Sequence, residues 1–289
     1  MKATYKILTD HLDVNMDENI YLWFFGDIHR DTRECDEDRW KYFLKKAKDT
    51  MTDNTFFIGM GDYHDFASTR EKRYLSSEGG DLHSSTSNLL DGIAEKHNRD
   101  LADELSFMRG RLLGLIEGNH SWRFENGKTS TEDLAERLDT KDMGWLCHYT
   151  TILHNTARHS YNIAVHYILC HGKAGGKTFG ITVNQVGDLK SIFPIADVYV
   201  MAHDHQRIAH PVSVLIPIKC RDGYQIKQKR QLLCRAGSFM KAYQDQSNSY
   251  EIFRLYRPSD LGALKIIISF VRNQSDDKDK MMLNIVAEI

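Results

Sequence analysis

The chain has 289 residues, 41% of them hydrophobic and 27% charged, and its net charge is −2. That much apolar sequence is enough for a substantial core, and the near balance of charge excludes a global attraction to nucleic acid or to an anionic membrane. The longest apolar runs are too short to cross a bilayer, and the first residues contain no apolar segment of a secretory signal. Five cysteines without a C-x-x-C pair are typical of reduced thiols, so we expect a cytoplasmic protein with no membrane partner.

The first half of the chain alternates short apolar runs with helical patterns, which favours parallel strand–helix–strand units. Residues 67–88 are polar and without periodicity, and we interpret them as a long loop that is a candidate lid over a site. The predicted elements are strands over Ile20–Phe25, Thr55–Ile58 and Arg111–Ile116, and helices over Asp36–Met51, Leu89–Met108 and 129–138, the last with a capping box at Thr129.

Strand patterns dominate the sequence beyond about residue 148, and one helix is predicted over Ile181–Ile192. The chain contains four prolines and no linker, so we expect a single domain over residues 1–289, of the α/β class with two sheets. The strands predicted in this half are Tyr149–Leu153, Tyr161–Cys170, Asp197–Met201, Ile208–Ile216, Gln231–Ala236, Tyr250–Tyr256, Ala263–Val271 and Met281–Ala287.

Residues that commonly bind metals follow five of the predicted strands. Because the carboxyl ends of strands in open α/β sheets meet at one crevice, these side chains should converge there. Alternate residues of an extended segment point the same way, so each D-x-H or H-x-H pair could hold one ion. Carboxylate, imidazole and amide ligands together suit Mn²⁺, Fe²⁺ or Zn²⁺ better than a thiolate site would. The blocks are Gly26-Asp27-Ile28-His29, Gly61-Asp62, Gly118-Asn119-His120, His171-Gly172 and Ala202-His203-Asp204-His205.

The stretch LCHGKAGGKT, residues 169–178, raises the alternative of a phosphate-binding P-loop. A Walker loop needs four residues between its first glycine and Gly-Lys-Ser/Thr, and only three separate Gly172 from Gly176. The motif fails by one residue, so we interpret His171 as the informative position of this stretch.

The five blocks, in this order from Asp27 to His205, resemble the calcineurin-like metallophosphoesterase superfamily, whose signature is D-x-H, GD, GNH, H and GHxH. The C-terminal segment is similar to bacterial and phage members. The resemblance implies a two-sheet β-sandwich flanked by helices, in four layers α/β/β/α. It also implies two divalent ions per chain, with Mn²⁺ the first expectation and Fe, Zn, Ni or Mg the alternatives. By the resemblance, one ion is held by Asp27, His29 and His205, and the other by Asn119, His171 and His203.

The resemblance gives Asp62 the bridging position between the two ions and gives His120 the protonation of the leaving group or the steadying of the phosphoryl group. Elementary chemistry agrees with both roles. A carboxylate offers two anionic oxygens for a bridging position, and an imidazole titrates in the pH range that proton transfer needs. The sequence departs from the family pattern at two positions. Ala202 replaces the glycine of GHxH, which matters if a positive φ is needed there, and Ser121 replaces an acidic residue after GNH.

These features predict a phosphoesterase that hydrolyses phosphodiester or phosphomonoester bonds with a metal-activated hydroxide. DNA and RNA are candidate substrates, because Arg123 and Lys173 could contact phosphate and the stretch Lys219–Arg230 is basic. Such a stretch can equally be ordinary protection of an edge strand. The alternatives are a phosphomonoesterase acting on a nucleotide, a nucleic-acid end or a phosphoprotein, and a non-catalytic scaffold. The oligomeric state is left open.

Overall fold

The computed structural model describes residues 4–66, 84–156, 162–173, 178–220, 223–243, 252, 255, 257–258, 260–273 and 280–289. Within them, eleven strands form a six-stranded sheet, in the order β1-β5-β6-β7-β9-β8, and a five-stranded sheet, in the order β11-β10-β2-β3-β4. The strands are β1 (Tyr5–Val14), β2 (Ile20–Phe25), β3 (Thr55–Gly59), β4 (Leu112–Leu115), β5 (Leu146–Asn155), β6 (Asn162–Cys170), β7 (Val198–Met201), β8 (Arg207–Cys220), β9 (Gly223–Ala236), β10 (Leu264–Asn273) and β11 (Lys280–Glu288). The helices are α1 (Glu37–Asp49), α3 (Ser84–Glu104), α4 (Ser130–Arg137), α5 (Phe179–Ile192) and the short 3-10 helix η2 (Ser106–Met108).

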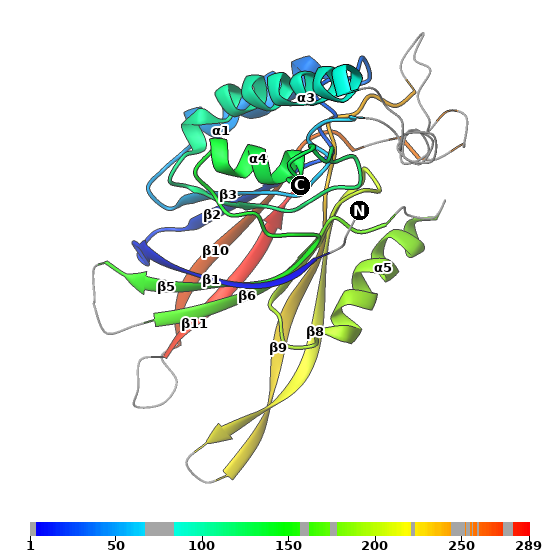
Figure 1. Cartoon of the computed structure of the whole chain (residues 1–289). Coiled ribbons are helices and arrows are strands. Elements are labelled where there is room, and N and C mark those ends of the chain that lie inside the picture. Colours follow the sequence, from blue (N-terminus) through cyan, green and yellow to red (C-terminus); the bar gives the residue numbers. More distant parts are fainter. Residues whose placement is uncertain are drawn as a thin grey trace.

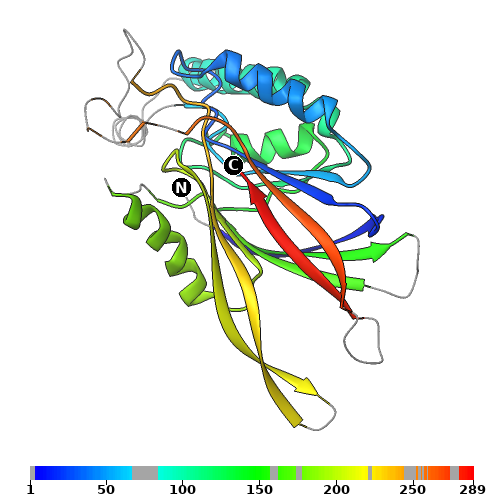
Figure 2. The same cartoon turned by 180° about the vertical axis from the view of Figure 1, so that it is seen from behind.

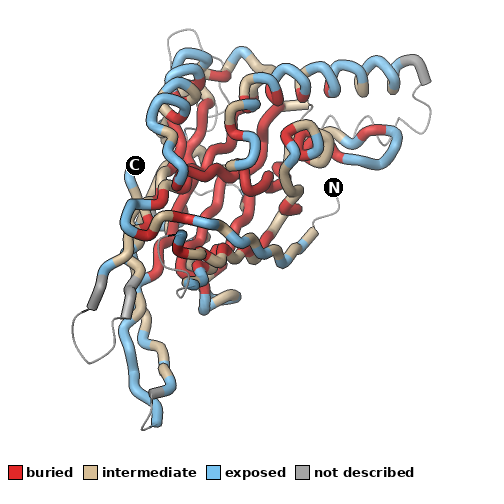
Figure 3. The backbone as a smooth tube through the Cα atoms, turned by 90° about the vertical axis from the view of Figure 1, so that its left-hand side faces the viewer, coloured by how far each residue is buried: buried red, intermediate tan, exposed pale blue. Residues whose placement is uncertain are grey.

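The two sheets pack face to face and each carries helices on its outer side (Figure 1). The largest apolar cluster lies between the sheets and draws on both, with Phe24 and Ile58 from one sheet and Tyr149 and Val200 from the other. A second cluster packs α1, α3 and α4 on the five-stranded sheet, and a third packs α5 on the six-stranded sheet. The result is the predicted four-layer α/β/β/α architecture, and Figure 3 shows its buried strands at the centre.

This architecture brings the carboxyl ends of several strands together, where a site can form. β2, β3 and β4 pair in parallel, so their carboxyl ends lie at one edge of the five-stranded sheet. β6 and β7 also pair in parallel and end at the corresponding edge of the other sheet. Runs such as IYLWFF in β2 form strands because both of their faces are covered. All five ligand-bearing blocks follow one of these five strands.

Three predictions of secondary structure need correction. β1 was not predicted because its sequence lacks an apolar run, and nine of its ten residues are exposed or half-exposed. Of the predicted loop 67–88, residues 67–83 lie outside the described residues, and α3 begins at Ser84, five residues before the predicted start. Of the predicted strand Tyr250–Tyr256 only two residues are described, and neither is extended: Ile252 is helical and Leu255 lies in a turn with φ 54°.

The hairpin of β8 and β9 extends beyond the body of the sandwich, as Figures 1 and 2 show from opposite sides. Among the described residues, no helix combines the length and apolar character needed to span a membrane.

Candidate metal centre

Loops from both sheets interlock at the carboxyl ends of the strands. The backbone N–H of Asp27 donates to the Gly61 carbonyl oxygen at 2.9 Å, and that of Ile28 donates to the Asp62 carbonyl oxygen at 2.9 Å. The backbone N–H of His203 donates to Oδ2 of Asp27 at 2.9 Å, which ties the six-stranded sheet to the five-stranded one. These bonds bring all seven predicted ligand residues to one place.

His171 is at the centre of the first group of donors. Its Nε2 lies 3.0 Å from Oδ2 of Asp62, 3.0 Å from Oδ1 of Asn119 and 3.1 Å from Nδ1 of His203. Its Nδ1 lies 2.8 Å from the Met60 carbonyl oxygen, a bond that only a protonated Nδ1 can make. When Nε2 carries no proton, its lone pair therefore points toward the other three side chains.

The second group contains Asp27, His29 and His205, whose donor atoms lie within 4.8 Å of one another. Nε2 of His205 lies 3.7 Å from Oδ1 of Asp27. Burial lowers the pKa of His29 to about 4, so its ring is neutral and able to bind a cation. Asp27 also lies within 4.8 Å of the first group, so its carboxylate is shared by both.

Asp62 joins the two groups through a single oxygen. Its Oδ2 is 3.0 Å from Nε2 of His171 and 3.9 Å from Nε2 of His29, whereas its Oδ1 accepts from the backbone N–H of His120 at 2.9 Å. Bridging was predicted because a carboxylate has two anionic oxygens. The structure instead uses one oxygen toward the ligands and the other to hold the His120 loop.

The donor set fits divalent cations. Around Nε2 of His171, a carboxylate oxygen, an amide oxygen and a second imidazole nitrogen face one another at about hydrogen-bond distance. In the second group, Oδ1 of Asp27 and both ring nitrogens of His29 are buried and have no hydrogen-bond partner within the described residues. Burial opposes the charged form of His171, but the Asp62 carboxylate outweighs it and raises the pKa of His171 to about 9. The arrangement therefore favours a positive charge at this point, which a bound cation can supply in place of the proton on His171.

His120 contributes differently from its neighbour Asn119. Its Nδ1 forms an ion pair with Oδ1 of Asp65, and its ring packs edge-on against His29 with centroids 5.0 Å apart. Burial opposes ionisation of Asp65, but the hydrogen bond and the charge interaction with His120, together with the nearby His29, outweigh it and lower the pKa of Asp65. The Asp65 carboxylate therefore fixes the orientation of the His120 ring.

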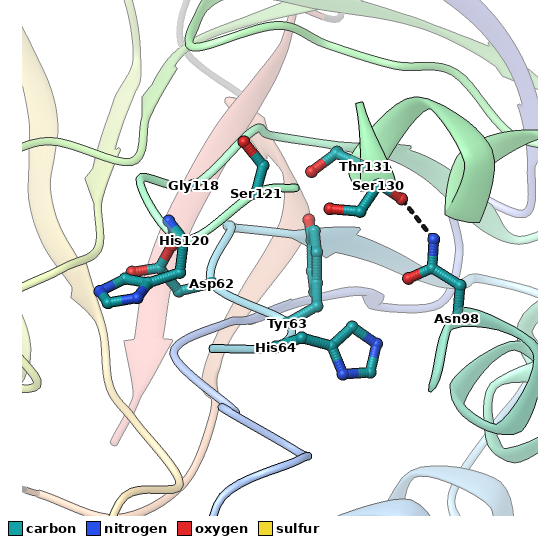
Figure 4. A pocket seen from close by; sticks show the side chains of 9 residues that line it. All are labelled: Asp62, Tyr63, His64, Asn98, Gly118, His120, Ser121, Ser130 and Thr131. Carbon is teal, nitrogen blue, oxygen red and sulfur yellow. Dashed lines mark hydrogen bonds between the residues drawn. The ribbon is translucent and has the colours of Figure 1, made fainter. Parts of the chain in front are cut away.

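A small polar pocket adjoins His120 on the side of α3 and α4 (Figure 4). Asn98 and His64 are buried in its wall, and Nδ2 of Asn98 donates to the Ser130 carbonyl oxygen at 2.7 Å. Both ring nitrogens of His64 are without a hydrogen-bond partner within the described residues. His64 thus lines the pocket next to the ligand set without belonging to it. The full lining is Asp62, Tyr63, His64, Asn98, Gly118, His120, Ser121, Ser130 and Thr131.

The backbone at the ligands is left-handed, which corrects the expectation of extended D-x-H and H-x-H segments. Five of the seven predicted ligands have φ between 45° and 72°: Asp27, His29, Asp62, His203 and His205. Ala202 is not among the residues with positive φ, so the loss of the family glycine there costs nothing. Gly118 packs so closely on Asp62 that a Cβ would overlap its carboxylate and its backbone nitrogen.

Two supporting residues were missed from the sequence. Arg235 is only 1% exposed and contacts the ligand loop, which carries His203 and His205. Its guanidinium donates to the Ala202 carbonyl oxygen at 2.7 Å and lies 3.3 Å from Oδ2 of Asp204. A lone arginine inside the apolar strand LLCRA was the available signal. The second is Glu117, which is buried and accepts from Oγ of Ser121 at 3.0 Å. It places a carboxylate beside the position where Ser121 replaces the acid of the family.

The two predicted phosphate contacts are not part of the cluster described above. Arg123 is exposed, and its guanidinium donates to the Gly127 carbonyl oxygen of its own loop at 2.8 Å. Lys173 is exposed two residues after His171, and residues 174–177 beyond it lie outside the described residues. The assignment of both to substrate stays a prediction.

No family model matches the chain, and no curated protein matches it. Among solved structures it is similar to a Vps29 mutant from Entamoeba histolytica, with 11% identity, 93% of this chain and 100% of that chain covered, and a TM-score of 0.35. It is also similar to GAP50 of Plasmodium, with 11% identity, 92% and 88% coverage and a TM-score of 0.38. A predicted phosphoesterase from Streptococcus pneumoniae matches with 9% identity, 93% and 90% coverage and a TM-score of 0.29.

These similarities are weak, so the interpretation of the fold rests on the chain itself. Its four layers, and the five blocks that converge in the predicted order at the ends of β2, β3, β4, β6 and β7, are the arrangement that the sequence resemblance to calcineurin-like metallophosphoesterases implied. The chain combines this architecture with an Asp/His cluster able to hold metal.

Proposed function

We propose that the chain is a phosphoesterase that uses two divalent ions to hydrolyse phosphodiester or phosphomonoester bonds. The observation that carries the proposal is the position of Oδ2 of Asp62, which faces His171 in one donor group and His29 in the other. Two ions held by these donor groups would supply an activated water and would neutralise the charge of the phosphoryl oxygens. Mn²⁺ fits the mixed oxygen and imidazole donors, and Fe, Zn, Ni or Mg are the alternatives.

The chain's own residues supply positioning and a proton. His120 lies beside the shared carboxylate, because its backbone N–H is bound to Asp62, and its Nδ1 is held by Asp65. The proton given to the leaving oxygen is then the one on Nε2 of the imidazolium. The bond between Nδ1 of His171 and Met60 fixes the tautomer that a ligand needs.

The test is turnover of bis-p-nitrophenyl phosphate and of p-nitrophenyl phosphate, with bound metal measured on the same samples after Mn²⁺ addition. The wild type should hold about two ions per chain and should hydrolyse at least one of the two substrates; preference for the first indicates a diesterase and preference for the second a phosphatase. Asp62→Asn should lower both metal content and turnover. The matched control is Asp13→Asn, the same change at an exposed position of β1. Full metal content without turnover of either substrate would identify a non-catalytic scaffold and contradict the proposal.

A further inference from the structure

The outer part of the β8–β9 hairpin extends beyond the sandwich as a two-stranded ribbon. Within the described residues, β9 pairs with β7 only over Leu232–Arg235, and farther out the two strands of the hairpin pair with each other. We call residues 213–220 and 223–230 the distal ribbon. A two-stranded ribbon alone is marginally stable in water, and Figure 3 shows this one as mostly exposed. A binding partner that covers the distal ribbon would therefore stabilise it.

One face of the distal ribbon combines apolar and basic side chains. The pairs Pro217–Ile226 and Lys219–Tyr224 follow the alternation that puts paired residues on a common face, together with Leu215 and Arg230. Leu215 is 73% exposed, Tyr224 75% and Ile226 67%. Apolar side chains this exposed, next to one another and bordered by cations, are typical of an interaction surface.

The positive charge of the distal ribbon indicates which class of partner it binds. Residues 213–230 contain five Lys or Arg and one Asp, in a chain whose net charge is −2. Lys229 is bound inward to Asp197 at 2.7 Å, whereas Lys219 and Arg230 are exposed on the apolar face. A second copy of the chain would bring like charges together. β8 is also an edge strand with prolines at 211 and 217, which lack the N–H needed for pairing with another strand.

We propose that the distal ribbon binds a nucleic-acid duplex and delivers its phosphodiester backbone to the metal centre; this proposal rests on the proposed function. Eight residues of strand extend about 27 Å, and a two-stranded ribbon fits a major groove about 12 Å wide. Lys219 and Arg230 contact phosphates, while Tyr224 and Leu215 pack on sugars and bases.

The ribbon is continuous with the site. β8 begins at Arg207, two residues after His205. β9 ends at Ala236, and beyond it the backbone N–H of Phe239 and the hydroxyl of Ser238 both donate to the Asp27 carbonyl oxygen, at 3.0 and 3.1 Å. The base of the hairpin therefore adjoins the metal centre, because β8 follows the loop of His203 and His205 and the segment after β9 is bonded to Asp27. A duplex long enough to lie along the whole hairpin would reach from the distal ribbon to that base.

The test is fluorescence anisotropy of a labelled 20-base-pair DNA with EDTA present, over 50 to 200 mM KCl. Lys219→Gln/Arg230→Gln should weaken binding by about tenfold or more and should lower the slope of log K against log[salt] by about 2, since each lost phosphate contact contributes about 0.9. The control Lys41→Gln/Lys45→Gln removes the same charge from exposed residues of α1 and should leave binding unchanged.

Turnover of bis-p-nitrophenyl phosphate on the same proteins separates this proposal from the one on which it rests, because that substrate is too small to reach the ribbon. Unchanged turnover in Lys219→Gln/Arg230→Gln with lost DNA binding supports the proposal. It is overturned if the wild type does not bind the duplex at 50 mM KCl, or if both double variants bind alike. It is also overturned if sedimentation shows a dimer that Leu215→Ser/Ile226→Ser dissociates, since a second copy then covers the ribbon. If the wild type binds DNA but fails to hydrolyse the small substrate, only the proposed function falls.

Discussion

Replacing the buried Arg235 by methionine should destabilise the protein and loosen the loop that carries His203 and His205. The guanidinium makes five polar contacts in a site that is only 1% exposed. Its Nη2 donates to Oε1 of Gln185 at 2.6 Å, and its Nε and Nη2 each lie 3.2 Å from the Thr182 carbonyl oxygen. The remaining contacts are to the Ala202 carbonyl oxygen and to Asp204. One side chain therefore joins α5, β9 and the ligand loop.

The expected cost follows from what methionine would leave behind. The side chain of Asp204 is only 4% exposed, and removing one partner of a buried ion pair costs about 3–5 kcal/mol. Two carbonyl oxygens would also lose their donor, at about 1–3 kcal/mol each before relaxation and water entry. We expect Arg235→Met to lower the free energy of unfolding by at least about 3 kcal/mol, which corresponds to a fall in Tm of roughly 6 °C for a chain of this size.

Urea denaturation in EDTA measures this stability, and Mn²⁺ titration measures the effect on the ligand loop. Arg230→Met, an exposed change five residues earlier on the same strand, should alter stability by less than about 0.5 kcal/mol. Adding Asp204→Asn to Arg235→Met should recover part of the loss, because no buried charge then lacks its partner. The reasoning is refuted if Arg235→Met keeps the wild-type free energy of unfolding, or if Asp204→Asn makes the double variant less stable still.

Three further predictions follow from the geometry of the site. Gly118→Ala should abolish metal binding, because a Cβ there would overlap Asp62. In the control Gly187→Ala, in α5, the new Cβ meets no atom within 4 Å and should raise the free energy of unfolding by up to about 1 kcal/mol. Equal metal affinity in the two variants would contradict this prediction. His120→Ala should keep the metal and lose about 10²–10⁴-fold in turnover, with a smaller loss for p-nitrophenol esters, whose leaving group needs no proton; loss of metal would instead make it a ligand. Burial raises the pKa of four of the five cysteine thiols, so at pH 8 no more than one cysteine should react with DTNB in the folded protein, and all five should react in guanidinium. The described four are Cys35, Cys147, Cys170 and Cys234.

The sequence predicted which polar side chains follow the strands and come together, because the signal for each of them is local. A short apolar run that ends in Gly-Asp or Gly-Asn marks both a buried strand and the polar residue after it. Ile20–Phe25, followed directly by Gly26-Asp27, is an example, and the structure ends β2 at Phe25. Thr55–Ile58 is similar, with Gly61-Asp62 two residues after the end of β3 at Gly59. The parallel order of the strands then determines that the ligands meet, without any knowledge of side-chain geometry.

What the sequence could not predict depends on contacts between distant segments. β1 pairs in parallel with β5, 141 residues away at Tyr5–Leu146, and its own residues alternate between exposed and half-exposed. The burial of Arg235 depends on hydrogen bonds to groups on α5 and on the ligand loop, about 50 and 33 residues away in the sequence. The use of a single Asp62 oxygen depends on where the His120 loop passes. No periodicity or spacing contains this information.

The left-handed ligands show why a site of this kind is specified by the fold and not by local preference. An Asp or His held at positive φ costs about 1–3 kcal/mol, and five such residues together rival the net stability of a domain. They persist because each loop is held by another: Gly61 accepts from Asp27, the Asp62 carbonyl oxygen accepts from the backbone N–H of His29 at 3.1 Å, and Oδ2 of Asp27 accepts from His203. A left-handed residue directly after a strand also turns the chain sharply, which lets residues two apart approach the same point. The packed sheets therefore maintain the strain and hold the donor groups in place.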